Sequence, residues 1–364
     1  MTEIKEIKSF IEKSLGDKWF IKNFDLSLLN SNNGNNNRLY KLLGPNNSSY
    51  VIKKYYNSHL SFNRINAEYN ALVFLKKYGI NNVPVPVAKD NIANCVMYKW
   101  IEGFKVSKIG DFEINSAISF MNQLKEASVS KDANSITLAK EACISANEIC
   151  RQIVYRYRLL KDSSAFNYEL AKYLRIDVDN ILFPIIKKAK EQFYNNGLSF
   201  DKPLSKKYQT LSPSDFGYHN AIKTIDGNIK FLDFEYFGWD DPVKLISDFL
   251  LHPGMNYLNF SFQMWKKFYS NSVKVFSYDP NFIVRLNILF PLFILRWSLI
   301  VLNEFIPLNW ERRKFSGQSD SKEKILKIQL QKSKKFIQQA HLSLEKDMFN
   351  IDDENYLDNF YRFS

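Results

Sequence analysis

The sequence has little of what marks disulfide-stapled, zinc-binding or linker-rich chains. Its three cysteines, Cys95, Cys143 and Cys150, are an odd number without a C-x-x-C pair, so neither a disulfide framework nor a zinc knuckle is indicated. It holds only 12 Gly and 11 Pro among 364 residues, and 45% of its residues are hydrophobic, which favours an ordered globular protein. The G-x-S-x-G pattern of serine hydrolases does not occur.

Long apolar runs are also scarce. The first residues carry acids among lysines and lack the apolar core of a signal peptide, so we expect a cytoplasmic location. The run Ile288–Leu302 is interrupted by Pro291 and Arg296 and is shorter than the roughly 20 residues that a spanning helix needs. We therefore expect it to form a buried core helix, and we expect no membrane span.

The charge balance is strongly basic, with a net charge of +12. Such a charge can indicate a nucleic-acid partner. About half of the excess lies between Trp310 and Ala340, where nine basic residues outnumber three acids. Leu326, Leu330 and Ile337 give that segment an apolar stripe, which favours an amphipathic helix with a solvated basic face. We expect no nucleic-acid partner.

The order of predicted elements indicates two lobes, as the length allows. We expect an α+β chain in two lobes. Its antiparallel sheet lobe with one main helix covers residues 1–99, and a mostly helical lobe covers 100–364, with a hinge at about 98–103. Strands are predicted at Asn23–Leu29, Arg38–Leu43, Tyr50–Tyr56 and Ala93–Tyr98, an extended connector at Val83–Ala88, and the main helix at Phe62–Tyr78. Later helices are predicted at Glu113–Leu124, Ala139–Leu160, Ile176–Tyr194, Pro242–Leu251, Ser261–Val273, Phe282–Phe305 and Lys322–Phe349.

A predicted hairpin organises the second half of the chain. Two β-prone runs, Ala221–Ile225 and Asn228–Leu232, flank an Asp-Gly pair that favours a two-residue type I′ turn. That turn places Asn220 opposite Asp233 at the open end. Amide and carboxylate oxygens are hard ligands of the kind that Mg²⁺ takes beside phosphate oxygens. Asp215 lies five residues before Asn220, in a turn-forming segment that we expect to reach the same point.

Candidate phosphate-binding groups lie in the first lobe. Lys53 is in the middle of a predicted strand, although alternation alone does not separate it from Lys54. Glu68 follows 15 residues later in the main helix, the spacing of a strand lysine paired with a helix glutamate. The Asn-rich loop around Asn35 could lay backbone N–H groups over a phosphate. Trp100 begins the predicted hinge.

The sequence resembles the aminoglycoside phosphotransferase and choline kinase-like superfamily of small-molecule kinases. The matching pieces occur in the family order over roughly residues 29–251. They are GNNNRLYKL, YVIKKY, AEYNALVFL followed by VPVP, MYKWIEG, SDFGYHN and FLDFEYFGWDDP.

The resemblance implies a two-lobed, protein-kinase-like fold and an ATP-dependent kinase that phosphorylates a hydroxyl of a small molecule. It implies that Asp215 is the catalytic base and that Asn220 and Asp233 hold Mg²⁺. It also implies that Lys53 and Glu68 position the phosphates, and that the segment from Tyr98 to Ile101, which includes Trp100, contacts the nucleotide base. We expect Mg-ATP to bind between the lobes.

Two positions depart from the family pattern. Pro213 stands where a histidine is usual two residues before the catalytic aspartate, and Leu245 stands where many members have an aspartate, the next acid being Asp248. We therefore expect the catalytic segment to be braced differently. An alternative hypothesis is a catalytically silent, kinase-like module whose basic helix docks an acidic partner. Retention of Lys53 and Asp215 argues against this alternative.

The acceptor is expected to be neutral, zwitterionic or anionic, such as a sugar derivative or an amino alcohol, rather than a polycation. Carboxylates are sparse in the second lobe until an acidic cluster after residue 346, and that cluster could fold back over the cleft. Aromatic residues available to line a pocket are Phe260, Phe262, Trp265, Phe268, Tyr269 and Trp297. Among the four histidines we find no zinc-hydrolase pattern, and we expect His219 to support the hairpin.

Overall fold

The computed structural model describes residues 2–16, 24–29, 37–45, 48–56, 63–258, 260–317 and 320–345. These residues form two compact units, each described here by itself. The sheet unit comprises Met1–Lys105, Asn220–Phe237 and Glu311–Ser319, and the helical unit comprises Val106–His219, Gly238–Trp310 and Asp320–Ser364. The predicted hairpin, which the sequence placed in the second lobe, thus groups with the sheet unit.

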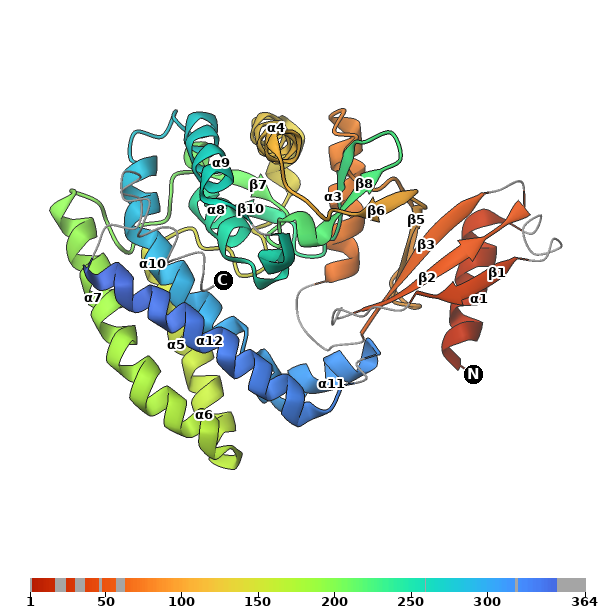
Figure 1. Ribbon diagram of the computed structural model, residues 1–364. Coiled ribbons are helices and arrows are strands. Elements are labelled where there is room, and N and C mark those ends of the chain that lie inside the picture. Colours follow the sequence, from red (N-terminus) through yellow and green to blue (C-terminus); the bar gives the residue numbers. More distant parts are fainter. Residues whose placement is uncertain are drawn as a thin grey trace. The chain divides into compact units, whose positions relative to one another are not determined.

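The sheet unit is built on a five-stranded antiparallel sheet in the order β1-β2-β3-β5-β4 (Figure 1). Its strands are β1 (Asp25–Leu28), β2 (Asn37–Leu43), β3 (Ser49–Tyr55), β4 (Pro86–Asp90) and β5 (Cys95–Lys99). This confirms the predicted α+β fold class. The prediction of a mere connector at Val83–Ala88 is wrong in part, because β4 pairs there with β5. Its proline is tolerated because β4 is an edge strand, and the register shifts between Pro86 and Ala88.

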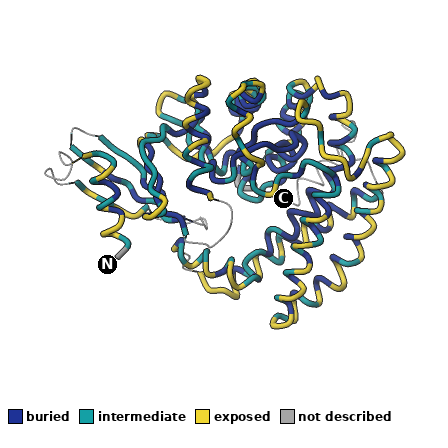
Figure 2. Tube along the Cα trace, turned by 180° about the vertical axis from the view of Figure 1, so that it is seen from behind, coloured by how far each residue is buried: buried dark blue, intermediate teal, exposed yellow. Residues whose placement is uncertain are grey.

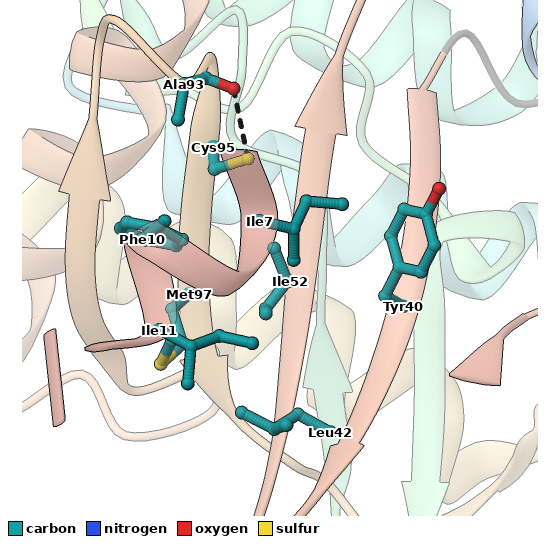
Figure 3. Packing of buried hydrophobic residues seen from close by; sticks show 9 residues of the cluster. All are labelled: Ile7, Phe10, Ile11, Tyr40, Leu42, Ile52, Ala93, Cys95 and Met97. Atoms are coloured by element: carbon teal, nitrogen blue, oxygen red, sulfur yellow. Dashed lines mark hydrogen bonds between the residues drawn. The ribbon is translucent and has the colours of Figure 1, made fainter. Parts of the chain in front are cut away.

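Helix α1 (Thr2–Leu15) covers one face of this sheet. Its Ile7, Phe10 and Ile11 point toward Ile52 and Met97 of the strands and are buried with them (Figure 3). The apolar spacing of α1 matches one helix face, and alternate strand residues supply the other side of the cluster. Helix α3 (Arg64–Lys77) begins at an Asn63 cap, whose side chain accepts from the backbone N–H of Asn66.

A second, three-stranded sheet has the order β6-β8-β9, with β6 at Gly103–Lys105, β8 at Ala221–Thr224 and β9 at Ile229–Phe231. The hairpin between β8 and β9 is present, but its predicted two-residue turn is wrong. The Gly227 N–H donates to the Thr224 carbonyl at 2.9 Å, and Gly227 has a φ of 85°. A turn followed by a left-handed glycine makes a three-residue loop, one residue longer than predicted.

The longer loop shifts the hairpin register by one residue. Ala221 pairs with Phe231, and Lys223 pairs with Ile229. Asn220 is therefore opposite Leu232, whose N–H donates to the Asn220 carbonyl at 2.8 Å, and not opposite Asp233. Asn220 and Asp233 still belong to the same open end of one hairpin.

The helical unit is formed mainly by helices packed around α10 (Phe282–Ile300), which contacts α5, α7, α8 and α12. Helices α8 and α10 are buried along most of their length, whereas α5, α7 and α12 carry buried residues on one side and exposed residues on the other, as expected for amphipathic helices (Figure 2). The other helices are α4 (Asp111–Ser128), α5 (Ala146–Ser163), α6 (Tyr168–Tyr173), α7 (Asp179–Asn195), α8 (Pro242–Leu251), α9 (Phe262–Val275) and α12 (Lys322–Glu345). Helix α11 (Pro307–Phe315), which the sequence did not predict, divides between the two units.

Two details of the helical unit differ from prediction. Helix α5 begins at Ala146 rather than Ala139, because Ser145 caps it by accepting the Glu148 N–H at 3.1 Å. Strands β7 (Thr210–Ser212) and β10 (Gly238–Asp240) pair into a small sheet that periodicity could not detect in three-residue segments.

Within the described residues, the helical stretch Phe282–Phe305 is the one long and apolar enough to cross a bilayer, and most of it is buried. This burial agrees with the core helix that the sequence predicts. Its buried Arg296 is paired with Glu141 at 2.8 Å.

Candidate active site

A buried ammonium among carboxylates is the main charged feature of the sheet unit. The Lys53 Nζ lies 2.7 Å from Glu68, 2.8 Å from Asp233 and 3.4 Å from Glu235. The Lys53 side chain is 7% exposed. Burial alone lowers the pKa of Lys53, but the three carboxylates, Asp233 foremost, outweigh it and hold that pKa well above its usual value.

The partners on α1 and α3 show which face of β3 each of the two lysines occupies, a choice that alternation in the sequence left open. Lys53 turns to the face where α3 presents Glu68, and Lys54 turns to the α1 face, where it bonds Glu6 at 2.7 Å. The Tyr55 hydroxyl also donates to Glu68. The predicted pairing of Lys53 with Glu68 is therefore present.

Glu235 connects the Lys53 cluster to Asn37 and Arg64. It accepts from Asn37 Nδ2 at 2.8 Å and lies 3.5 Å from the Arg64 guanidinium. Burial raises the pKa of Glu235, but the charges of Lys53 and Arg64 outweigh it and lower that pKa to about 2. Glu235 is thus a fixed, buried anion. The sequence alone assigned no role to Asn37 or Arg64.

Asp233 lies two residues after the end of β9 and has a φ of 65°. Aspartate adopts this left-handed conformation more readily than most residues, and a non-glycine residue there commonly marks a functional constraint. Carboxylate oxygens of Asp233, Glu235 and Glu68 lie within 4.8 Å of one another. Such a set of hard oxygen donors can hold Mg²⁺ together with the oxygens of a bound phosphate.

Two backbone amides of the predicted hinge already donate hydrogen bonds within the sheet unit. The Lys99 N–H donates to Val85 at 3.0 Å, and the Trp100 N–H donates to Ser49 at 3.0 Å. The Trp100 ring lies under the Lys41 ammonium, 4.0 Å from its centroid. Tyr98 is buried. Burial is the main cause that raises the pKa of its hydroxyl, and the negative charge of Glu68 is the second. The same hydroxyl also interacts with the charge of Lys53, so it belongs to the surroundings of the lysine cluster. A nucleotide base would therefore use other backbone groups of this segment than these two amides.

In the helical unit, Asp215 contacts two histidines. Its Oδ1 lies 2.9 Å from the Nε2 of His219 and 3.3 Å from the Nε2 of His252. The two rings are stacked, with centroids 3.6 Å apart and planes inclined by 6°. His219 therefore contacts the candidate base directly, four residues after it in sequence, a spacing that offered a signal for this pairing.

These three residues also have the composition of a metal site, since one ligand atom from each lies within 4.8 Å of the others. A coordinated ion lies near the plane of each imidazole that binds it. Two parallel rings 3.6 Å apart cannot both satisfy this for one ion, so the arrangement serves hydrogen bonding to Asp215.

The segment before Asp215 is anchored by α8. Ser214 has a φ of 70°, and its hydroxyl accepts from the Lys244 Nζ at 2.8 Å. Lys244 is buried and pairs with Asp240 at 3.0 Å and Asp248 at 3.2 Å. Asp241 caps α8 by accepting the Val243 N–H at 2.8 Å. The changed bracing expected from Pro213 and Leu245 thus comes from other residues of α8.

The sequence matches no family model and no curated protein. Solved structures do match the fold. A choline kinase from Streptococcus pneumoniae aligns at a TM-score of 0.56 and 16% identity, over 93% of this chain and 100% of that chain. A choline/ethanolamine kinase family protein from Mesorhizobium loti aligns at 0.53 and 13% identity, over 88% of this chain and 91% of that chain.

A spectinomycin phosphotransferase, solved in complex with ADP and spectinomycin, aligns at a TM-score of 0.51 and 12% identity, over 88% of this chain and 98% of that chain. The fold is that of the choline kinases and aminoglycoside phosphotransferases. This confirms the resemblance seen in the sequence at the level of the fold.

Within this kinase-like fold, the predicted site residues fall into two groups. Lys53, Glu68 and Asp233 are in mutual contact in the sheet unit, to which Asn220 also belongs. Asp215 belongs to the helical unit. Asn35 lies outside the described residues, as do the acidic residues after position 346.

The kinase-like fold uses most of the predicted pocket aromatics as core. Trp265, Phe268 and Tyr269 are buried, with Trp265 stacked on Tyr269 and Phe268 stacked on Phe249. All three fall on the inward face of α9 and serve as core; that they also line an acceptor pocket stays a prediction. Trp297 lies against the ring of His252, with centroids 4.8 Å apart.

Proposed function

We propose that this chain is an ATP-dependent phosphotransferase that transfers the γ-phosphoryl group to a hydroxyl of a small molecule. The observation that carries the proposal is the position of Lys53. Glu68 and Asp233 hold it on the sheet face toward which α3 presents Glu68. A buried cation fixed by a helix glutamate is the arrangement that binds nucleotide phosphates in kinases.

The phosphate-binding roles follow from the contacts in the sheet unit. Lys53 would donate to the α- and β-phosphates while Glu68 keeps its ammonium in place. Asp233, at the open end of the hairpin with Asn220, would supply oxygen ligands to Mg²⁺. An Mg²⁺ ion held there would supply positive charge that offsets the charge of the phosphates during transfer. The residues present fit this ion, because all are hard oxygen donors.

Asp215 would act on the acceptor. The acceptor oxygen forms a bond to the γ-phosphorus, the bond from that phosphorus to the bridging oxygen of ADP breaks, and ADP leaves with the electron pair. The proton of the acceptor hydroxyl passes to the Asp215 carboxylate. Because the transition state has little covalent character for a protein to support, Asp215 contributes by positioning the hydroxyl and accepting this proton.

The acceptor that we propose is neutral, zwitterionic or anionic, such as a sugar derivative or an amino alcohol. The charged groups that act on His252, beside Asp215, include the cation Lys332. A nearby cation repels a polycationic acceptor. Because the donor is ATP, a cytoplasmic location belongs to the same proposal.

Calorimetry with two variants tests the roles separately. Mg-ATP should bind to the wild type and to Asp215→Asn with nearly equal affinity, while Asp215→Asn lowers turnover by on the order of 10²-fold or more. Asp233→Asn should weaken binding in the presence of Mg²⁺ and leave binding without Mg²⁺ little changed. Titration of Mg-GTP in parallel compares the two nucleotides. Equal phenotypes for the two variants would contradict the separate roles.

A further inference from the structure

Helix α8 presents a row of charged and polar side chains toward the segment that carries Asp215. The row consists of Lys244 and Asp248 of α8, which are four residues apart and share one side of the helix, together with Asp240 at the end of β10 and His252, the residue that ends α8. Lys244 donates to Ser214 at 2.8 Å, and His252 lies 3.3 Å from Asp215. Neighbouring residues of the catalytic segment are thus contacted by α8 and by the residue that ends it.

The hydrogen bonds of His252 fix its tautomer. The Gly254 N–H donates to His252 Nδ1 at 3.0 Å, so Nδ1 is an acceptor and the ring proton is on Nε2. His252 Nε2 lies 3.3 Å from Asp215 Oδ1. Trp297 contacts the same ring edge-to-face, and its indole donates to Asp248 at 2.8 Å, which ties it to the same helix. The His252 ring is therefore held in place from several sides.

We propose that His252 is the positioning residue of Asp215, in place of the histidine that Pro213 replaces. This inference rests on the proposed kinase function. A neutral donor holds the carboxylate in one orientation without supplying the positive charge that would reduce its basicity. Burial and the neighbouring His219 lower the pKa of His252 to about 3, so the ring stays neutral over the working pH range.

A pair of substitutions at His252 tests the donor role. His252→Phe keeps a flat ring that can stack on His219 but removes the donor, and we expect kcat to fall on the order of 10- to 100-fold with the KM for ATP unchanged. His252→Gln retains an N–H donor and should recover part of the loss. His341→Phe, an exposed histidine on α12, is the matched control and should leave kcat unchanged. An equal loss in the Phe and Gln variants, or none in either, would overturn the proposal.

A measurement on the wild type does not depend on activity. Nitrogen NMR of the histidine rings should show His252 protonated on Nε2 and unprotonated on Nδ1, and Asp215→Asn should shift the Nε2–H resonance. A proton on Nδ1, or no response to Asp215→Asn, would overturn the contact even if the enzyme is active. Absence of any phosphoryl transfer, with these NMR results as expected, would instead count against the proposed function alone.

Discussion

Two adjacent lysines on β3 offer a controlled test of the phosphate site. Lys53→Met removes the lysine that pairs with Glu68 and Asp233, while Lys54→Met removes a lysine of equal size from the opposite face. Loss of charge-assisted hydrogen bonds worth about 1.5–3 kcal/mol should weaken Mg-ATP binding roughly 10- to 100-fold in Lys53→Met. Binding to Lys54→Met should match the wild type, because Lys54 bonds Glu6 and the Ala93 carbonyl.

The same substitution should change stability by an amount that the burial sets. Glu68 and Glu235 are 2% and 3% exposed in their side chains, so their charges are poorly screened once Lys53 is gone. Removing one partner of a buried ion pair costs about 3–5 kcal/mol. Arg64 still faces Glu235, and the Tyr55 hydroxyl still bonds Glu68, so we expect the lower end, about 3 kcal/mol. Lys54→Met, whose partner Glu6 is half exposed, should cost about 1 kcal/mol.

Urea unfolding followed by tryptophan fluorescence, at pH 7 and in steps toward pH 2, measures both effects. In the wild type, the lowered pKa of Glu235 contributes stability that is present above its unfolded value near 4.5 and is lost as the pH falls toward about 2. Lys53→Met should lose part of this acid dependence. Equal binding by the two methionine variants, or a stability change below about 0.5 kcal/mol for Lys53→Met, would refute the reasoning.

Three further predictions concern packing and charge. A Cβ at Gly103 would lie 2.4 Å from the Lys223 carbonyl oxygen, so Gly103→Ala should lower the midpoint of thermal unfolding, whereas Gly197→Ala, with open space around it, should show only the cost of its left-handed backbone. Lys244→Met removes the cation paired with the buried Asp240, while Asp248 keeps Arg296 at 3.6 Å, and should destabilise the fold by about 3–5 kcal/mol in urea unfolding; an unchanged midpoint would contradict the network. Burial raises the pKa of Glu141, but the charges of Arg156 and Arg296 outweigh it and lower that pKa to about 2. The contribution of Glu141 to stability is therefore present above its usual pKa and should fade as the pH falls toward 2. Glu141→Gln should remove that part of the acid dependence.

Most of the sheet unit could be predicted because its signals are local. Strand runs, the main helix predicted at Phe62–Tyr78 and the spacing of Lys53 and Glu68 each depend on a few neighbouring residues. Alternation could not choose between Lys53 and Lys54, because both lysines are buried and each has a carboxylate partner. That choice depends on which helix covers which face, which is a property of the tertiary structure.

The errors have equally specific causes. An Asp-Gly pair fits both a two-residue turn and a three-residue loop with a left-handed glycine, and Gly227 takes the second. The role of His252 was missed because it lies 37 residues after Asp215 and meets it only through the path of α8. The sequence offered Trp265 and Tyr269 as aromatic residues for a pocket, but it could not show that their face of the helix is buried.

Direct observation of phosphoryl transfer tests the central claim. The purified chain should be incubated with Mg-ATP labelled in the γ-phosphoryl group and a panel of acceptors that includes sugars, choline-like amines and aminoglycosides. We predict a labelled, phosphorylated product from a sugar or an amino alcohol, formed by the wild type and lost in Asp215→Asn, which should still bind Mg-ATP. No binding of nucleotide with Mg²⁺ or Mn²⁺ present would contradict the kinase function, and robust labelling of an aminoglycoside alone would contradict the acceptor class.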